Sequence, residues 1–404
     1  MINLEVPRKF KPLVRQAHET AAEVLRPISR KYDQAEHERP VELDMLAAVI
    51  DGMNEGNSEV GGTGATGVRR DANDQSQGNR NGTNLSTALS IMELCWGDVG
   101  MLLSMPRQGL GNSAIASVAN DEQLKRFKGR WAAMAITEPG CGSDSAAIRT
   151  TARLDGDHYV LNGEKIYVTS GDRADLVVVW ATLDKSLGRA AIKSFVVEKG
   201  TPGFELVRLE HKLGIRASDT AAFLLKDCRV PKENLMGDPS INPEKSFAGV
   251  MQTFDNTRPL VAAMAVGLTR ACIEEMGKIL KECGMAVDYA KPAARQPAAV
   301  AEYIRMQSDY EAARLLTMQA AWMADNARPN SLEASLAKAK AGRTCVDVAL
   351  KCVELAGSIG YTETALLEKW SRDAKILDIF EGTQQIQLLI IARRLLGKSS
   401  AELK

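Results

Sequence analysis

Residues 135–144 read AITEPGCGSD, and they mark the point at which the hydrophobic pattern of the chain changes its period. Before this stretch apolar residues recur at helical spacing, and after it they form short runs typical of strands. Its glycines allow a planar ring to approach the backbone, and the hydroxyls of Thr137 and Ser143 can bond the polar edge of such a ring. Because most Gly-Ser turns are only turns, the stretch alone leaves a plain turn and a ligand-binding loop both open.

The region that follows predicts a small, mainly antiparallel β domain ending near Pro231. The runs Tyr159-Val160-Leu161 and Ile166-Tyr167-Val168 flank Asn162-Gly163, a dipeptide that favours a tight hairpin turn. Further strand-like runs stand at 176–183, 194–198 and 222–226. We therefore expect a hairpin at Asn162-Gly163 and several more strands after it.

Helical periodicity occupies both ends of the chain. Residues 10–26 form an amphipathic pattern with Pro12 near its start and Pro27 as its expected stop, and helical spacing resumes over 84–128. Toward the C-terminus the pattern predicts long helices at 243–283, 296–326, 331–356 and 383–396, with Gly397 ending the last. Long helices with short links predict a bundle.

The segment 53–84 is rich in glycine, asparagine and charge, and it carries too few apolar residues to order itself alone. It predicts a mobile loop, or a loop that contacts a partner or covers a substrate. Around it, the chain divides into an N-terminal helical domain (1–132), a middle β domain (133–240) and a C-terminal helical bundle (241–404). The expected fold class is α+β.

The overall composition excludes several function classes. The chain has 404 residues, and its 51 basic residues balance 51 acidic ones, so no bulk charge attracts nucleic acid or anionic membrane. No apolar run reaches membrane-spanning length, and the start of the chain lacks the pattern of a secretion signal. Seven scattered cysteines suit a reducing compartment, and the four histidines share no metal-ligand spacing. We expect a cytoplasmic protein without a metal.

Six stretches in unbroken order over about 84–397 resemble the successive signatures of the acyl-CoA dehydrogenase family. They are AITEPGCGSD (135–144), NGEKIYVTSG (162–171), KLGIRASDT (212–220), DCRVPKENLMG (227–237), FDNTRPLVAAMAVGL (254–268) and RDAKILDIFEGTQQIQ (372–387). One such match could be chance, whereas six in register identify the chain as similar to this family. The resemblance implies a helical domain, a middle β domain and a C-terminal four-helix bundle, with FAD between sheet and bundle.

The resemblance also implies which residues contact the ligands. Those carried over for FAD are Ile136, Thr137, Gly142, Ser143, Tyr167, Val168, Thr169, Thr383 and Gln385. Those carried over for the acyl-CoA are Ser143, Asp255, Arg258 and Gly382. Tyr167 stands where family members commonly carry Trp, which is an aromatic exchange. Arg258, which precedes Pro259, is also open to a role as an ion pair within the bundle.

Glu381 matches the position of the family's catalytic base. The implied reaction removes the α-hydrogen of an acyl-CoA thioester as a proton and the β-hydrogen as hydride, giving the trans-2-enoyl-CoA. Some family members carry the base on the first long bundle helix, but the matching residue here is Thr257, which cannot serve. Without the resemblance, a lone Glu before a helix is only a charge favoured by the helix dipole. The family's usual electron acceptor is electron-transfer flavoprotein.

Two stretches depart from the family pattern. In homo-oligomeric members a neighbouring subunit completes each FAD site with Arg-x-x-Phe-Gly and Gln-x-x-Gly-Gly stretches, which fall here on AVDYA (286–290) and ELAGS (354–358). The arginine is absent, and Glu354 beside a pyrophosphate would be repulsive. We therefore expect a hetero-oligomer in which a homologous, unlike subunit supplies these contacts. Two alternatives remain: Arg295 reaches across in a homo-oligomer, or the loss is tolerated.

Two other functions stay open at this point. An acyl-CoA oxidase would pass electrons to oxygen, although oxidases of this kin generally carry an extra C-terminal domain. A non-catalytic partner subunit would only support an active chain, although Glu381 and the flavin motifs are intact. Straight-chain, branched and steroid side-chain substrates share the CoA end, so the resemblance implies the reaction and not the acyl group.

Overall fold

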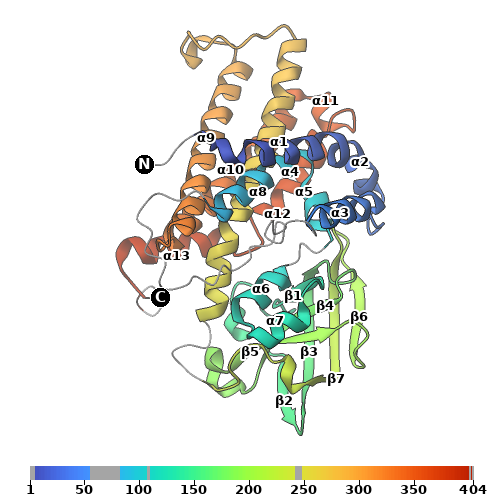
Figure 1. Cartoon of the computed structure of the whole chain (residues 1–404). Coiled ribbons are helices and arrows are strands. Elements are labelled where there is room, and N and C mark those ends of the chain that lie inside the picture. Colours follow the sequence, from blue (N-terminus) through green and yellow to red (C-terminus); the bar gives the residue numbers. More distant parts are fainter. Residues whose placement is uncertain (1–4, 55–81, 107–109, 242–247, 400–401, 403–404) are drawn as a thin grey trace.

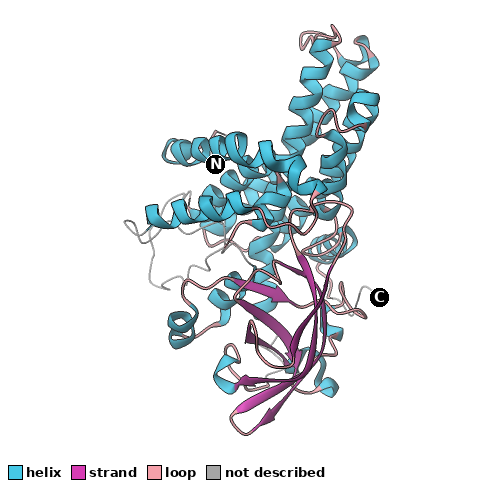
Figure 2. Ribbon diagram, turned by 90° about the vertical axis from the view of Figure 1, so that its right-hand side faces the viewer, coloured by secondary structure: helices cyan, strands magenta, loops and turns pink. Residues whose placement is uncertain are grey.

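The computed structural model describes residues 5–54, 82–106, 110–241, 248–399 and 402 (Figure 1). A helical body and a β sheet lie one beyond the other, with the sheet at one end of the helices (Figure 2). The segment 53–84, which is predicted to form a loop, lies outside the described residues except at its two ends. The α+β architecture of N-terminal helices, middle sheet and C-terminal helices is confirmed.

The N-terminal helices are longer than the pattern predicts. α1 (Lys11–Thr20), a π-helical turn (Ala21–Leu25) and α2 (Arg26–Gln34) follow one another without a break. The prediction that Pro27 ends the first helix is therefore wrong. In the π turn the Arg26 N–H donates to the Ala21 carbonyl five residues back, and this wider turn accommodates a proline that has no N–H to donate.

Five further helices precede the sheet. They are α3 (Val41–Asn54), α4 (Thr83–Gly97), α5 (Val99–Ser104), α6 (Leu110–Val118) and α7 (Asp121–Phe127). α6 and α7 lie against the sheet (Figure 1), and Ile115 and Phe127 are buried there with Leu176 and Val178. A capping box at Asn120 and Gln123 starts α7.

The sheet has seven strands in the order β1-β4-β2-β3-β7-β6, with β5 also paired to β4. The strands are β1 (Ala132–Ala135), β2 (Thr151–Asp155), β3 (His158–Thr169), β4 (Leu176–Thr182), β5 (Ile192–Glu198), β6 (Phe204–Leu209) and β7 (Thr220–Pro231). Pairing is antiparallel except between β4 and its neighbours β1 and β2. β4 is buried along its whole length, which explains its continuous apolar run LVVVWAT.

The hairpin predicted at Asn162-Gly163 is wrong. β3 runs straight through this dipeptide, and the turn to β2 lies six residues closer to the N-terminus, between Asp155 and His158. The β3–β7 register shifts between Leu161 and Gly163, so the dipeptide forms a bulge. A Cβ on Gly163 would lie 2.4 Å from Thr150 Oγ1, and the glycine is therefore required for close strand approach.

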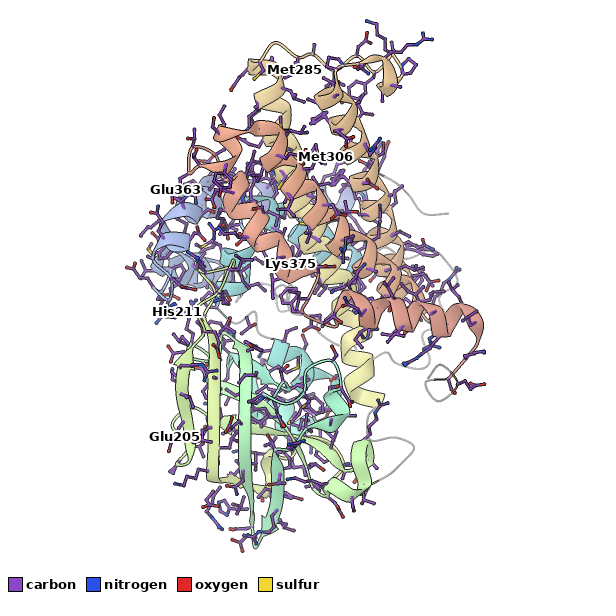
Figure 3. All side chains as sticks on the ribbon, turned by 180° about the vertical axis from the view of Figure 1, so that it is seen from behind. Glu205, His211, Met285, Met306, Glu363 and Lys375 are labelled. Carbon is purple, nitrogen blue, oxygen red and sulfur yellow. The ribbon has the colours of Figure 1, made fainter. Side chains whose placement is uncertain are left out.

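The C-terminal helices confirm the long periodic segments. They are α8 (Ala248–Glu282), α9 (Ala298–Asp325), α10 (Ser331–Ala356), α11 (Ser358–Tyr361), α12 (Leu367–Leu377) and α13 (Gln384–Leu396). Gly397 ends α13 in the left-handed conformation, as expected. The buried helix α12 was not foreseen; it lies at the end of the bundle nearest the sheet, whereas Met285 between α8 and α9 lies at the far end (Figure 3).

One hydrophobic core joins the N-terminal and C-terminal helices. Leu25 and Leu43 are fully buried in the same cluster as Leu268 of α8 and Leu377 of α12. The sheet has a separate core around Leu161 and Phe195. The seven cysteines are all described and all free. Among the described residues, no helix combines the length and the apolarity needed to cross a membrane.

Candidate active site

Glu381 lies in the turn between α12 and α13 (residues 378–383). It has a φ of 55°, and Gly382 after it has a φ of 92°, so two successive residues adopt the left-handed region. Such a conformation is strained for a glutamate and persists only where the surroundings hold it. The half-buried Glu381 side chain accepts a hydrogen bond from Thr257 Oγ1 of α8 at 2.9 Å.

The surroundings of the Glu381 carboxyl favour its protonated form more than water does. Burial raises its pKa above the ordinary glutamate value, and three groups oppose this rise: the Thr257 hydroxyl, the Arg258 guanidinium and the Lys338 ammonium. Thr257 and Arg258 are both 3% exposed. A half-buried carboxylate with a raised pKa suits a general base.

The other residues predicted near this turn are placed as follows. Gly382 follows Glu381, and Thr383 caps α13 by accepting from the Ile386 N–H at 3.4 Å. Gln385 is exposed on the first turn of α13. Asp255 lies on α8, but its side chain lies outside the described part of the chain. The structure thus brings Glu381, Gly382, Thr383 and Arg258 together.

Two buried residues at this turn were missed from the sequence. Lys338 of α10 donates from Nζ to the Gly382 carbonyl at 2.7 Å, and Gln387 of α13 donates from Nε2 to the carbonyls of Glu381 and Gly382 at 3.2 and 3.1 Å. Both side chains are fully buried. A lysine within an alanine-rich helix carries no local signal of such a contact, since its acceptor lies 44 residues further along the chain.

The AITEPGCGSD stretch leaves β1 and folds back against β3. Thr137 accepts from the Ile166 N–H at 2.9 Å, and the Ile136 carbonyl accepts from Lys165 Nζ at 2.9 Å. Lys165 also pairs with Glu138 at 2.7 Å, and both are buried. Burial raises the pKa of Glu138, but Lys165 and Thr150 outweigh it and hold that pKa below the ordinary value. This buried ion pair fixes the stretch to the sheet.

The three predicted residues of β3 lie at a second bulge, where the β3–β7 register shifts between Lys165 and Val168. Tyr167 has a φ of 58° and its side chain is 62% exposed, so its ring stands out from the sheet. Val168 is fully buried beside it, and Thr169 pairs with Thr220 of β7. Bulges are a common means of re-aiming a side chain at a site.

The glycine turn of the stretch is open. Gly142 and Ser143 are exposed, and a Cβ added to Gly142 would meet only the Thr137 methyl group, at 3.8 Å. A pocket of ≈ 200 Å³ opens beside this turn, on the sheet rather than at Glu381. Its lining includes Pro139, Lys165 and Ile166.

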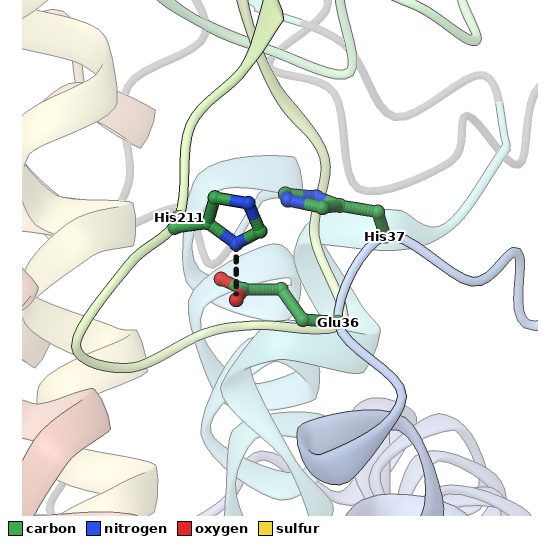
Figure 4. Close-up of side chains that lie close together, drawn as sticks. All are labelled: Glu36, His37 and His211. Atoms are coloured by element: carbon green, nitrogen blue, oxygen red, sulfur yellow. Dashed lines mark hydrogen bonds and ion pairs between the residues drawn. The ribbon is translucent and has the colours of Figure 1, made fainter.

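A separate cluster joins the α2–α3 loop to the β6–β7 connection. Glu36, His37 and His211 offer ligand atoms that all lie within 4.8 Å of one another, a grouping that could hold a metal and that the sequence spacing did not indicate (Figure 4). His211 Nδ1 already bonds Glu36 at 2.9 Å, and the other Glu36 oxygen accepts from the Lys212 N–H at 2.8 Å. The hydrogen bonds already made by Glu36 favour a contact between segments over a metal centre.

The chain matches two family models, "Acyl-CoA dehydrogenase, middle domain" over residues 133–228 and "Acyl-CoA dehydrogenase, C-terminal domain" over residues 247–396. A short-chain specific acyl-CoA dehydrogenase of Clostridium acetobutylicum is 36% identical over 79% of this chain and 84% of its own length. The mitochondrial short-chain specific enzyme of Mus musculus is 38% identical over 65% of this chain and 62% of its own length.

Solved structures agree with these relatives. The butyryl-CoA dehydrogenase of Megasphaera elsdenii is similar with a TM-score of 0.82 and 28% identity, covering 98% of this chain and 100% of that chain. A chain from a structure described as the electron transferring flavoprotein of Acidaminococcus fermentans is similar with a TM-score of 0.83 and 31% identity, covering 98% and 100%. On sequence and fold together, the chain belongs to the acyl-CoA dehydrogenase family of enzymes.

Proposed function

We propose that this chain carries out FAD-dependent α,β-dehydrogenation of an acyl-CoA to the trans-2-enoyl-CoA, with Glu381 as the base. The observation that carries the proposal is the half-buried Glu381, whose carboxyl has a raised pKa, bonds Thr257 and sits in a strained turn at the sheet end of the bundle. A plain helix-terminal charge would need neither the burial nor the strain.

The β3 bulge and the glycine turn fit a flavin. Tyr167 presents an exposed ring, Gly142 leaves open space for a planar group, and Ser143 and Thr169 offer hydroxyls. The Trp180 indole N–H is buried behind Ile136 without a hydrogen-bond partner in the described residues, which adds a donor on this side. Bound FAD would supply the acceptor for the β-hydrogen and its electron pair.

The chain's own residues account for the proton. As the α C–H bond breaks, its proton goes to a Glu381 carboxylate oxygen, and the Cα=Cβ bond forms as the β-hydrogen leaves with its electron pair. Thr257 orients the carboxylate by its hydrogen bond. The Glu381 N–H would donate to the thioester oxygen as negative charge grows there. Arg258 would face the CoA side of the substrate.

A short straight-chain acyl-CoA is the first substrate to test, since two of the relatives are named short-chain specific and one is a butyryl-CoA dehydrogenase. Electron-transfer flavoprotein is the proposed acceptor. Turnover of butyryl-CoA with this acceptor and without hydrogen peroxide would support a dehydrogenase. Peroxide formed in step with product under air would assign the chain to the oxidases instead.

We also propose that an unlike, homologous subunit completes the FAD site. The segment 286–290 follows Met285, which lies at the end of the bundle farthest from the sheet (Figure 3). The segment is therefore too far from Glu381 to contribute to the site in its own chain. Tyr289 in this segment is 69% exposed, and Arg295 nearby is also exposed. The exposed Glu354 pairs with Lys351 at 2.6 Å. If a second copy of this chain contributed these residues to an FAD site, it would not supply the arginine of the family's usual Arg-x-x-Phe-Gly stretch.

Flavin stoichiometry tests the subunit proposal. The chain expressed alone should bind less than one FAD per chain, and addition of the unlike subunit should raise the flavin content. Stoichiometric FAD on the chain alone would contradict it. Replacing Glu381 by Gln in the flavin-loaded enzyme tests the base: loss of enoyl-CoA formation supports the proposed role, and unchanged turnover assigns catalysis to the other subunit.

A further inference from the structure

The turn that carries Glu381 is held from inside the bundle. Two successive residues of this turn have a positive φ, Glu381 at 55° and Gly382 at 92°. Three hydrogen bonds converge on these two carbonyls, two from Gln387 and one from Lys338. Since a strained glutamate persists only where its surroundings hold it, these donors determine where the carboxyl lies.

Gln387 alone could hold the turn as a neutral donor. It is fully buried, and its Nε2 bridges both carbonyls. The second donor is a lysine, and a buried ammonium costs more desolvation than a neutral amide. Burial lowers the pKa of Lys338 to about 8. The hydrogen bond to the Gly382 carbonyl alone therefore does not explain why a charged lysine occupies this buried position.

The charge of Lys338 has a second recipient. The ammonium acts on two carboxylates, Asp378 and Glu381, and it is opposed by Arg258. Asp378 already has two other cations, Arg343 at 3.2 Å and Lys375 at 3.4 Å. The Glu381 carboxyl faces only Thr257, Arg258 and Lys338 among the groups that lower its pKa. Without Lys338, Asp378 would keep two cations, whereas the Glu381 carboxyl would keep only Arg258.

We propose that Lys338 is the positioning residue of the Glu381 turn: its ammonium holds the Gly382 carbonyl and, together with Gln387, presents the Glu381 carboxylate in its ionised form. This inference rests on the proposed function, in which Glu381 is the base. Lys338 touches neither substrate nor flavin in this account and acts through the turn and through its charge.

The test compares Lys338→Met with Lys340→Met in the flavin-loaded enzyme. Lys340 lies on the same helix, pairs with Asp309 at 2.5 Å and has a side chain that is 36% exposed, so it controls for loss of a lysine from α10. Lys338→Met should keep its flavin and its circular dichroism, while kcat for butyryl-CoA falls about tenfold or more and KM changes little, because the base is misplaced. Lys340→Met should match the wild type.

The pH profile separates this role from simple packing. Removing a cation that favours the carboxylate should move the acid limb of kcat upward by roughly 0.5–1 pH unit, less than the 1–3 units of a direct ion pair. Lys338→Gln keeps a donor without the charge, so it should recover part of kcat and retain the shifted limb. If Lys338→Met does not fold, the kcat and the acid limb of Lys338→Gln test the positioning role instead.

The inference is overturned if a folded, flavin-loaded Lys338→Met or Lys338→Gln variant keeps the wild-type kcat and acid limb. Glu381→Gln is measured in parallel, so that a failure of the proposed base can be distinguished from a failure of the proposed role of Lys338. An active Glu381→Gln enzyme removes the proposed base itself, whereas an inactive one beside a fully active Lys338→Met removes only the role of Lys338.

Discussion

Thr257 is the only hydroxyl that bonds the Glu381 carboxyl among the contacts described, and it stands where some members of the family carry the base. Its hydrogen bond lowers the pKa of Glu381 against the effect of burial. As the proposed base, Glu381 must be ionised to accept a proton, so we expect activity to be lost as the pH falls through its raised pKa. The position of this acid limb therefore reports the environment of Glu381.

Replacing Thr257 by Val removes the hydrogen bond and should move the acid limb of kcat upward by roughly one pH unit. Thr269→Val is the matched control, because Thr269 is also buried on α8 but bonds its own helix at the Ala265 carbonyl. The measurement is kcat for butyryl-CoA across the acid range. An unshifted limb in Thr257→Val would mean that this hydroxyl does not set the charge of the base.

Gly382→Ala should impair both stability and turnover. A Cβ at Gly382 would lie 2.5 Å from Gln387 Nε2, and the φ of 92° is unfavourable for alanine. The expected cost is about 1–3 kcal/mol in the free energy of unfolding, measured by urea denaturation, with a fall in kcat. Gly397→Ala has a comparable positive φ of 63° and no atom within 4 Å, so it should lose stability alone. Equal kcat in the two variants would contradict this.

The residues of this turn illustrate what the sequence could and could not show. Glu381 was found because its motif has a recognisable order, and Thr257 was identified only as a residue unable to act as base. Lys338 and Gln387 were missed, since each acts through a buried contact with a backbone carbonyl that no side-chain pattern marks. Tertiary contacts of this kind follow from packing and not from periodicity.

The long strand β3 carries two bulges that local pattern could not separate from a turn. Asn162-Gly163 has the composition of a hairpin, but nine residues of β3 pair with β7 on both sides of it. Long-range pairing with β7 therefore overrode a strong local preference. The helical segments were easier to predict, because α9 and α10 each repeat their apolar spacing over many turns.

Gly163→Ala should destabilise the sheet. Its Cβ would lie 2.4 Å from Thr150 Oγ1 and 2.7 Å from Thr150 Cα, and Thr150 in turn bonds Glu138. We expect a loss of about 1–3 kcal/mol in the free energy of unfolding and weaker flavin binding. Gly156→Ala, in the turn between β2 and β3, has a φ of 63° and open space, so it should leave flavin binding intact. Wild-type stability of Gly163→Ala would contradict the bulge geometry.

A buried charge cluster joins distant parts of the whole molecule. Lys369 of α12 bonds Asp98, which precedes α5, and pairs with Asp373 at 2.7 Å. Asp373 also accepts from the Ile215 N–H at 2.5 Å, which reaches the connection between β6 and β7. All three charged side chains are at most 2% exposed. The cluster therefore links the N-terminal helices, the bundle and the sheet.

Lys369→Met should leave two buried carboxylates without their cation and cost about 3–5 kcal/mol in the free energy of unfolding. The triple variant Asp98→Asn, Lys369→Met, Asp373→Asn removes all three charges and keeps the acceptors for Met101 and Ile215, so it should recover most of the loss. Urea denaturation of both proteins measures this. A Lys369→Met variant as stable as the wild type would show that the cluster does not couple the parts.

Single-turnover reduction of the bound flavin by butyryl-CoA, followed by the loss of its visible absorbance, isolates the step in which Glu381 is proposed to take the α-proton. Glu381→Gln should bind flavin as the wild type does and slow this reduction by about 10²–10⁴-fold, the usual contribution of a general base. Reduction of the Glu381→Gln flavin at the wild-type rate would contradict the assignment of the base.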